Sequence, residues 1–391
     1  MTRPDRPTVL QVITQLGLGG AEAVAIDICS GLDPSQVAGL FCVRSGVHDD
    51  VGAAWNDQLQ AAGMTVITGS RLPTKLGGLV QAGERLARTL RALRPDIVHV
   101  HTEIPEVALA VASIVGPRVS IPHAVRTVHN STLWPRWRRF AAWTERRLTN
   151  VPVAAVSASA LAGLTSLRVA VGLAPVPEHL TRIIHNGRPV PRRSQLDAPR
   201  DDAVRVLFAG RLEEQKGADL LPSILRHIDP SVAGSIRLTV AGSGSLGAWL
   251  RTELPRVGGI GSVAVTDPIP TLSEKLTDFD MVIMPSRFEG LALLAIEAGL
   301  AGVALVLTDA PGLIETVPPD HPWVAPAGDA VAFASVVTEA IRRRERWPGI
   351  DAAALDNAMR RFELSVMQQA YRAFYSEVAA TRLASNESTR T

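Results

Sequence analysis

The stretch DMVIMPSRFEGLALLAIEAGLAGVALVLT (residues 280–308) consists of two short apolar runs joined by a longer segment of helical character. The runs at 280–286 and 302–308 are rich in Val, Ile, Leu and Met, and the segment between them begins with Arg287 and is otherwise apolar except for two carboxylates, Glu289 and Glu297. Apolar runs separated by a helix are typical of parallel strands that are covered on both faces. The stretch therefore predicts a strand–helix–strand unit of an α/β fold.

The same alternation recurs in two series along the 391-residue chain. The other apolar runs lie at residues 8–14, 38–43, 64–68, 96–100, 123–128, 153–157 and 181–185, and then at 204–210, 235–242, 262–267 and 322–326. Residues 188–202 contain three prolines and mixed charge without a hydrophobic period, which is typical of a linker. A chain of this length also favours two domains over one.

We therefore predict an α/β protein made of two tandem Rossmann-like, doubly wound domains. The expected boundaries are 1–190 for the first domain, 191–202 for the linker, 203–362 for the second domain, and 363–391 for a closing helix with a disordered tail. Ligands bind at the carboxyl ends of the strands in such sheets, so we expect the site in a cleft between the domains.

Charge is distributed unequally between the two halves. The chain holds 40 Lys+Arg and 38 Asp+Glu, of which 21 and 13 fall in residues 1–195, giving 21 − 13 = +8 there and 19 − 25 = −6 in the remainder. The basic half should meet the more anionic partner. Cys29 and Cys42 lie in apolar segments, which favours buried reduced thiols and a cytoplasmic protein. We expect no membrane span and no nucleic-acid partner.

Glycines after the first apolar run could bring backbone N–H groups close to an anion. In QLGLGGAE (15–22), Gly19 and Gly20 precede a helix predicted to begin near Ala21, and the positive end of that helix would face the same anion. A tight turn without a ligand is the alternative.

Histidines follow two strands of the first series. DIVHVHTE (96–103) places His99 and His101 on one face of a strand, with Glu103 just beyond it, and His129 follows the next strand. Two histidines can bind a metal ion, but no third ligand falls at an obvious spacing, and packing is the commoner role. We expect no metal site.

In AGRLEEQKG (209–217), Arg211 and Lys216 follow a strand at the start of a helix. A guanidinium and an ammonium in that position suit a diphosphate, although a solvated turn is the alternative.

A literal G-x-G-x-x-G also occurs in the second series, at Gly242, Gly244 and Gly247, with Asp267 further along. This pattern favours a rival function, an NAD(P)-dependent oxidoreductase.

The two carboxylates of the opening stretch, Glu289 and Glu297, are eight positions apart. If the helix begins near Gly290, Glu297 lies roughly two turns from its start and cannot touch the same atom as Glu289. Buried carboxylates need partners, and hydroxyl groups of a ligand would supply them.

In this order and spacing, the segments resemble the GT-B-fold retaining glycosyltransferases of family 4, also described as glycosyl transferases group 1. The resemblance rests on GLGGAE (17–22), DIVHVHTE (96–103), RTVHN (126–130), AGRLEEQKG (209–217), VAGSGSL (240–246), MPSRFEGLALLAIEAGLAG (284–302) and RFELSVMQQAYRAFYSEV (361–378). Glu289 and Glu297 match the family's E-x7-E motif. Ala292 departs from it, because glycine is common there, as does Val303-Ala304-Leu305, where Pro-Val-Val is usual.

The resemblance implies a nucleotide-sugar donor, with a UDP-sugar favoured, and a glycan, glycolipid or small-molecule acceptor in cell-surface polysaccharide or glycoconjugate biosynthesis. It implies transfer with retention and without a metal, and a final helix that packs back on the first domain. The implied catalytic residues are His101, Glu289, Arg211 and Lys216. The implied donor-binding residues are Gly19, Gly20, Arg211, Lys216, Gly242, Gly290, Leu291, Ala292, Leu293 and Glu297, and the implied acceptor-side residues are His129 and Glu103. A non-catalytic nucleotide-sugar-binding protein is a further alternative.

The segment WPRWRRFAAWTERRL (134–148) combines three Trp, one Phe and five Arg on a predicted helix. It is either a peripheral contact with the inner face of a membrane or a core helix whose arginines reach out to solvent.

Overall fold

The computed structural model describes residues 6–17, 19–44, 50–73, 77–115, 123–135, 137–191 and 203–388. Most of the predicted linker, and residues 389–391 of the predicted tail, lie outside these ranges. The chain forms two compact units, Met1–Gly187 with Ser365–Thr391, and Arg188–Leu364.

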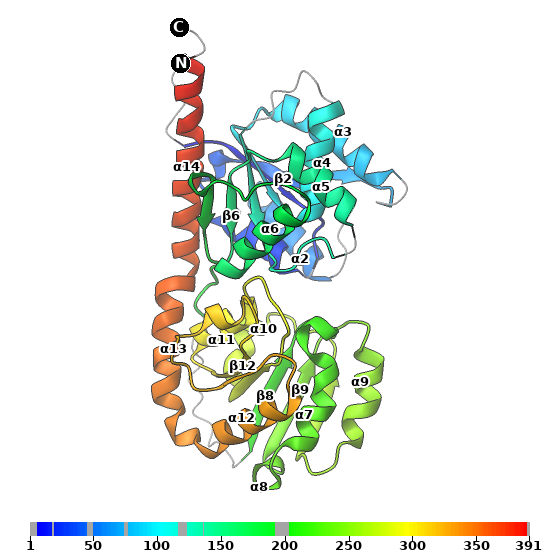
Figure 1. Ribbon diagram of the computed structural model, residues 1–391, viewed down its shortest axis with the longest axis vertical. Helices are drawn as coiled ribbons and strands as arrows, with labels where there is room; N and C mark the ends of the chain where they lie inside the picture. The colour runs from blue at the N-terminus through cyan, green and yellow to red at the C-terminus, as the bar shows by residue number, and fades with distance from the viewer. Residues whose placement is uncertain are drawn as a thin grey trace. The chain divides into compact units, whose positions relative to one another are not determined.

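The first unit is built on a seven-stranded parallel sheet in the order β3-β2-β1-β4-β5-β6-β7 (Figure 1). Its strands are β1 (Val9–Ile13), β2 (Val37–Arg44), β3 (Val66–Ser70), β4 (Ile97–His101), β5 (His123–Val128), β6 (Val153–Ala155) and β7 (Thr181–Ile183). Its helices are α1 (Gly20–Ser30), α2 (Asp50–Ala61), α3 (Gly78–Leu93), α4 (Glu103–Val115), α5 (Arg138–Arg147), α6 (Ala158–Ala170) and the long α14 (Leu364–Ser388).

The two faces of this sheet differ in polarity at its centre. Leu10, Val98 and Val100 pack with α3 and α4 in one apolar cluster. Neighbouring residues of a strand point to opposite faces, so Gln11 and His99, which pair across β1 and β4, face the other way. There they meet tyrosines of α14, which Figure 1 shows running alongside this sheet.

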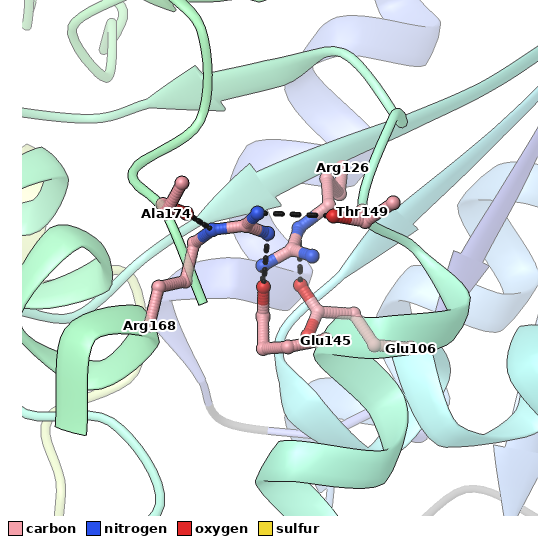
Figure 2. A network of polar contacts seen from close by, with 6 residues as sticks. All are labelled: Glu106, Arg126, Glu145, Thr149, Arg168 and Ala174. Atoms are coloured by element: carbon pink, nitrogen blue, oxygen red, sulfur yellow. Dashed lines mark hydrogen bonds and ion pairs between the residues drawn. The ribbon is translucent and has the colours of Figure 1, made fainter. Parts of the chain in front are cut away.

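On the same apolar face of the sheet, β5 contributes Arg126 to a buried cluster of charged side chains (Figure 2). Arg126 lies 2.5 Å from Glu145 of α5 and 3.2 Å from Glu106 of α4, and Arg168 of α6 lies 2.9 Å from Glu145. All four side chains are almost fully buried. The cluster therefore ties three helices to one strand by charge-assisted contacts.

The second unit is built on a six-stranded parallel sheet in the order β10-β9-β8-β11-β12-β13. Its strands are β8 (Val204–Ala209), β9 (Ile236–Ala241), β10 (Ser262–Thr266), β11 (Met281–Met284), β12 (Ala304–Thr308) and β13 (Val324–Ala325). Its helices are α7 (Leu221–His227), α8 (Pro230–Ala233), α9 (Gly247–Glu253), α10 (Leu272–Lys275), α11 (Leu293–Ala301), α12 (Ala330–Arg342) and α13 (Trp347–Phe362). The predicted strand–helix–strand unit of the opening stretch is confirmed as β11–α11–β12.

Both cysteines are free and buried, as expected, and burial raises the pKa of each thiol to about 12. Within the described part of the chain, no helix combines the length and the hydrophobicity needed to span a membrane.

Candidate functional site

An ion pair joins two loops at the carboxyl ends of β8 and β11 in the second unit. The loop after β8 carries Lys216, whose Nζ lies 2.7 Å from Oε1 and 2.8 Å from Oε2 of Glu289, in the loop after β11. Ser286 Oγ donates a further hydrogen bond of 2.8 Å to Glu289 Oε1. Glu289 is only 5% exposed. A carboxylate this buried needs partners, and the lysine and the serine supply them.

A glycine allows these two loops to lie against each other. Gly217 has φ +71°, and a Cβ at this position would lie 2.0 Å from the carbonyl oxygen of Pro285. Gln215 joins the same loops, because its amide donates a hydrogen bond of 3.1 Å to the carbonyl oxygen of Phe288. These contacts place Lys216 beside the turn that follows β11.

Glu297 is paired with Arg188, a residue that no motif of the sequence marks as part of the site. Arg188 Nε donates to Glu297 Oε1 at 2.6 Å. Burial raises the pKa of Glu297, and the positive charge of Arg188 opposes this rise. The prediction that the helix begins near Gly290 is wrong, since α11 begins at Leu293 and Glu297 lies about one turn from its start. Glu297 and Glu289 nevertheless bind different cations, Arg188 and Lys216.

Gly290, Leu291 and Ala292 form the turn that leads into α11. Leu291 and Ala292 are buried, and Ala292 packs in a core cluster of the second unit, which accounts for a methyl group where the family often has glycine. The N-cap residue of α11 is Ala292, whose side chain makes no capping hydrogen bond. The N–H groups of the helix's first turn are suited to binding an anion.

Arg211 and the glycine loop after β9 complete this end of the second sheet. Arg211 is exposed, and its guanidinium donates to Gln215 Oε1 at 2.6 Å. A Cβ at Gly242 would lie 1.9 Å from the carbonyl oxygen of Gly210, so this glycine is required for close packing of the two loops. Asp267, the acidic residue of the rival dinucleotide pattern, is exposed and pairs with Arg251 at 2.7 Å.

In the first unit, the predicted residues His101 and His129 lie together. His129 Nε2 and His101 Nδ1 are 3.0 Å apart, and His101 Nε2 lies 2.8 Å from Gln11 Oε1. Burial lowers the pKa of His101 well below its usual value and lowers that of His129 to about 3. Both imidazoles are therefore neutral near pH 7.

Thr102 connects His101 to α4 in a strained conformation. Its φ of +70° is unusual for a β-branched residue, and its Oγ1 lies 3.3 Å from Thr14 Oγ1. Such strain is concentrated at functional sites. Glu103 is the first residue of α4 and is partly exposed.

The glycines after β1 lie at the start of α1. Gly19 is the residue before the helix, Gly20 is its first residue, and no side chain caps it. Leu18 of the same loop lies outside the described residues.

Among the residues that the structure describes, no three His, Cys, Asp or Glu side chains are grouped so that they could hold a metal ion.

Comparisons with known proteins agree with the resemblance noted in the sequence. A family model described as Glycosyltransferase Family 4 matches residues 18–191, and one described as Glycosyl transferases group 1 matches residues 203–343. A glycogen synthase of Mycobacterium tuberculosis is 30% identical over 362 residues, which cover 85% of this chain and 82% of that protein. A 2-deoxystreptamine N-acetyl-D-glucosaminyltransferase of Streptomyces fradiae is 27% identical and covers 77% of each chain.

A solved structure shows the same fold over nearly the whole chain. HepE of Anabaena, in complex with UDP-glucose, has a TM-score of 0.75 with 19% sequence identity, over 96% of this chain and 99% of that one. The chain therefore belongs to the glycosyl transferases group 1, or glycosyltransferase family 4, and is a transferase enzyme with the two-domain GT-B fold. Family membership removes the oxidoreductase alternative.

Proposed function

We propose that the chain transfers a sugar from a UDP-sugar to a hydroxyl group of a glycan, glycolipid or small-molecule acceptor, with retention of anomeric configuration. We place this reaction in cell-surface polysaccharide or glycoconjugate biosynthesis. The observation that carries the proposal is the Lys216–Glu289 pair beside the uncapped start of α11, with Glu297 one helical turn beyond. The complex of HepE with UDP-glucose supports a uridine nucleotide.

In this proposal, the charged residues of the second unit each bind a different part of the donor. Lys216 and Arg211 bind the diphosphate, Glu289 binds hydroxyl groups of the transferred sugar, and Glu297, held by Arg188, binds the ribose hydroxyls. The backbone N–H groups of Gly290, Leu291, Ala292 and Leu293, together with those of Gly242, Gly19 and Gly20, are assigned to the phosphates. In the first unit, His101 is assigned to a position beside the transferred sugar and the acceptor, and His129 and Glu103 are assigned to the acceptor.

The proposed chemistry stabilises charge on the leaving group. As the bond to the diphosphate breaks, Lys216, Arg211 and the start of α11 neutralise the developing negative charge, where preorganised donors have their greatest effect. The acceptor hydroxyl attacks on the face from which the diphosphate leaves, and a phosphate oxygen takes its proton. Protein cations fill the role of a metal ion in this scheme, so turnover should persist in EDTA.

Nucleotide binding and turnover together test this function. UDP is expected to raise the thermal unfolding temperature, by an amount that corresponds to about 2.7 kcal/mol when its concentration is about 100 times Kd, whereas NAD(H) should have no effect. Release of UDP from UDP-sugars, compared with GDP- and ADP-sugars, measures turnover. Stabilisation by GDP or ADP, but not by UDP, would mean that the donor nucleotide contains guanosine or adenosine in place of uridine. UDP binding without turnover, with any acceptor offered, would favour a non-catalytic binding protein.

We further propose that α5 makes a peripheral contact with the inner face of a membrane. Trp137 and Phe140 are 50% and 45% exposed, with ring centroids 5.5 Å apart, and Arg138 and Arg139 lie exposed between them. Trp134, by contrast, is buried in the core beneath. Exposed aromatic rings beside arginines suit the headgroup region of an anionic bilayer.

The double variant Trp137→Ala with Phe140→Ala should therefore lose most of its binding to anionic vesicles. Cosedimentation with phosphatidylglycerol vesicles at low salt measures the loss, and Trp249→Ala, which removes an exposed Trp from the second unit, is the matched control. Equal cosedimentation of the three proteins, or none by the wild type, would contradict the membrane contact.

A further inference from the structure

A chain of hydrogen-bonded side chains crosses the face of the first sheet that α14 covers. Its members, in order of contact, are His129, His101, Gln11, Tyr375, His99, Thr127 and Tyr371. The successive polar atoms are 3.0, 2.8, 3.0, 2.7, 2.6 and 3.0 Å apart. Every member except His129 is at most 1% exposed, and the chain includes the only two tyrosines of the protein.

The amide of Gln11 gives this chain a direction. Its oxygen only accepts, so the hydrogen between Gln11 and His101 must lie on His101 Nε2. A neutral imidazole carries a single N–H, so His101 Nδ1 accepts, and the hydrogen it receives lies on His129 Nε2. His129, which is also neutral, therefore has a bare Nδ1.

Tyr375 holds the other side of the Gln11 amide. The Gln11 nitrogen donates to Tyr375 Oη at 3.0 Å, and this hydroxyl lies 2.7 Å from His99 Nδ1. Since the amide nitrogen occupies the tyrosine side, the amide oxygen is left facing His101. With the Gln11 N–H donating to it, the Tyr375 hydroxyl uses its own hydrogen toward His99 Nδ1. This arrangement keeps the amide oxygen of Gln11 toward His101 and so sets the tautomer of both histidines.

The series of hydrogen-bonded side chains ends at His129, just beyond the carboxyl end of β5. Among the described residues, none hydrogen-bonds to His129 Nδ1, and His129 is partly exposed. The next residue, Asn130, has a buried Oδ1 that also has no hydrogen-bond partner in the described part of the protein. A bare ring nitrogen on a partly exposed side chain is an acceptor for a ligand that brings a hydroxyl hydrogen.

We propose that Tyr375 is a positioning residue of the acceptor site: through Gln11 and His101 it fixes His129 in the tautomer whose bare Nδ1 accepts the hydrogen of the attacking hydroxyl group. The inference rests on the proposed function for the identity of that hydroxyl group. His129 orients the hydroxyl and is too weak a base to remove its proton, because burial lowers its pKa to about 3.

Tyr375→Phe separates this role from simple packing. The variant keeps the aromatic ring but leaves the Gln11 N–H without its acceptor, so the amide is free to turn and present its nitrogen to His101. His101 would then carry its hydrogen on Nδ1 and donate to His129 Nε2, and His129 Nδ1 would become a donor. Tyr371→Phe is the matched control, because it lies beyond His99 and Thr127 and leaves the bond between Gln11 and Tyr375 in place.

Nitrogen-15 NMR of histidine-labelled full-length protein reads the tautomers directly. The expected result is an unprotonated His129 Nδ1 in the wild type and in Tyr371→Phe, and a protonated one in Tyr375→Phe, with signals assigned by His129→Gln and His101→Gln variants. A protonated His129 Nδ1 in the wild type would overturn the proposal, whatever the behaviour of Tyr375→Phe. Unchanged tautomers in a folded Tyr375→Phe would overturn it as well.

Kinetics provide the second readout. In Tyr375→Phe, transfer to the acceptor should fall about tenfold to a hundredfold, while the UDP-induced thermal shift and donor hydrolysis stay at the wild-type level. Equal transfer in Tyr375→Phe and wild type would remove the positioning role. Absence of UDP binding in the wild type would instead overturn the proposed function. The tautomer measurement does not depend on UDP and would still test whether Tyr375 sets the tautomer of His129.

Discussion

Replacing Lys216 with alanine is expected to lower kcat/KM for transfer from a UDP-sugar by about a hundredfold to a thousandfold. The substitution removes a cation assigned to the leaving diphosphate and also leaves Glu289, which is 5% exposed, without its strongest partner. A buried carboxylate without a cation tends to take up a proton or to turn toward water, and either change disturbs the sugar subsite. Initial rates of UDP release, with donor concentration varied, measure the loss.

Two further variants separate the charge of Lys216 from its contact with Glu289. Lys275→Ala removes an exposed lysine from the same unit and should leave the rate unchanged. Glu289→Gln keeps the shape of the carboxylate and loses its charge, so the double variant with Lys216→Ala gives the coupling between them. A rate for Lys216→Ala within about twofold of the wild type would contradict the assigned role, as would a loss equal to that of Lys275→Ala.

Apolar pattern was sufficient to predict the two sheets, because the central strands of each sheet contain almost no exposed positions. The runs 97–101 and 304–308, for example, are buried along their full length, and each is a strand. The same rule explains why Gln11 and His99 are informative: a polar residue in a fully buried strand must have a buried partner. The pattern shows that such a partner exists but does not identify it.

Contacts between residues far apart in the chain account for what could not be predicted. Tyr375, the partner of Gln11, lies 364 positions away, and Arg188, the partner of Glu297, lies 109 positions away. The start of α11 was misplaced for the same reason, since the N–H of Glu289 is bound by the carbonyl oxygen of Pro311, which holds the turn out of the helix. The helical propensity of residues within the stretch cannot predict a contact with a residue outside it.

Arg126→Met is expected to lower the free energy of unfolding by about 3–5 kcal/mol, because it leaves Glu106 and Glu145 buried without their shared cation. Figure 2 shows Arg126 and Arg168 converging on Glu145, so Arg126→Met leaves Glu145 with Arg168 and takes from Glu106 the cation that the cluster gives it. Thermal unfolding of the first unit measures the effect. Arg182→Met is the matched control, because Arg182 pairs with Glu377 at 2.9 Å but both are exposed, and it should change stability by less than about 1 kcal/mol. Similar losses in the two variants would contradict the energetic role of the buried cluster.

The same cluster makes stability depend on pH through Glu106. Burial raises the pKa of Glu106 from 4.5 to about 8, an effect that the charge of Arg126 only partly opposes. Between these two values the folded chain binds more protons than the unfolded chain, so the stability that this group contributes is complete below pH 4.5 and is lost as the pH rises through about 8. Glu106→Gln, which keeps the shape of the protonated carboxyl group and cannot ionise, should therefore flatten the decline in unfolding temperature from about pH 6 to about pH 8. A slope identical to that of the wild type would mean that Glu106 is already ionised in the folded protein. Both carboxylates of the cluster would then be charged, and each would be paired with an arginine.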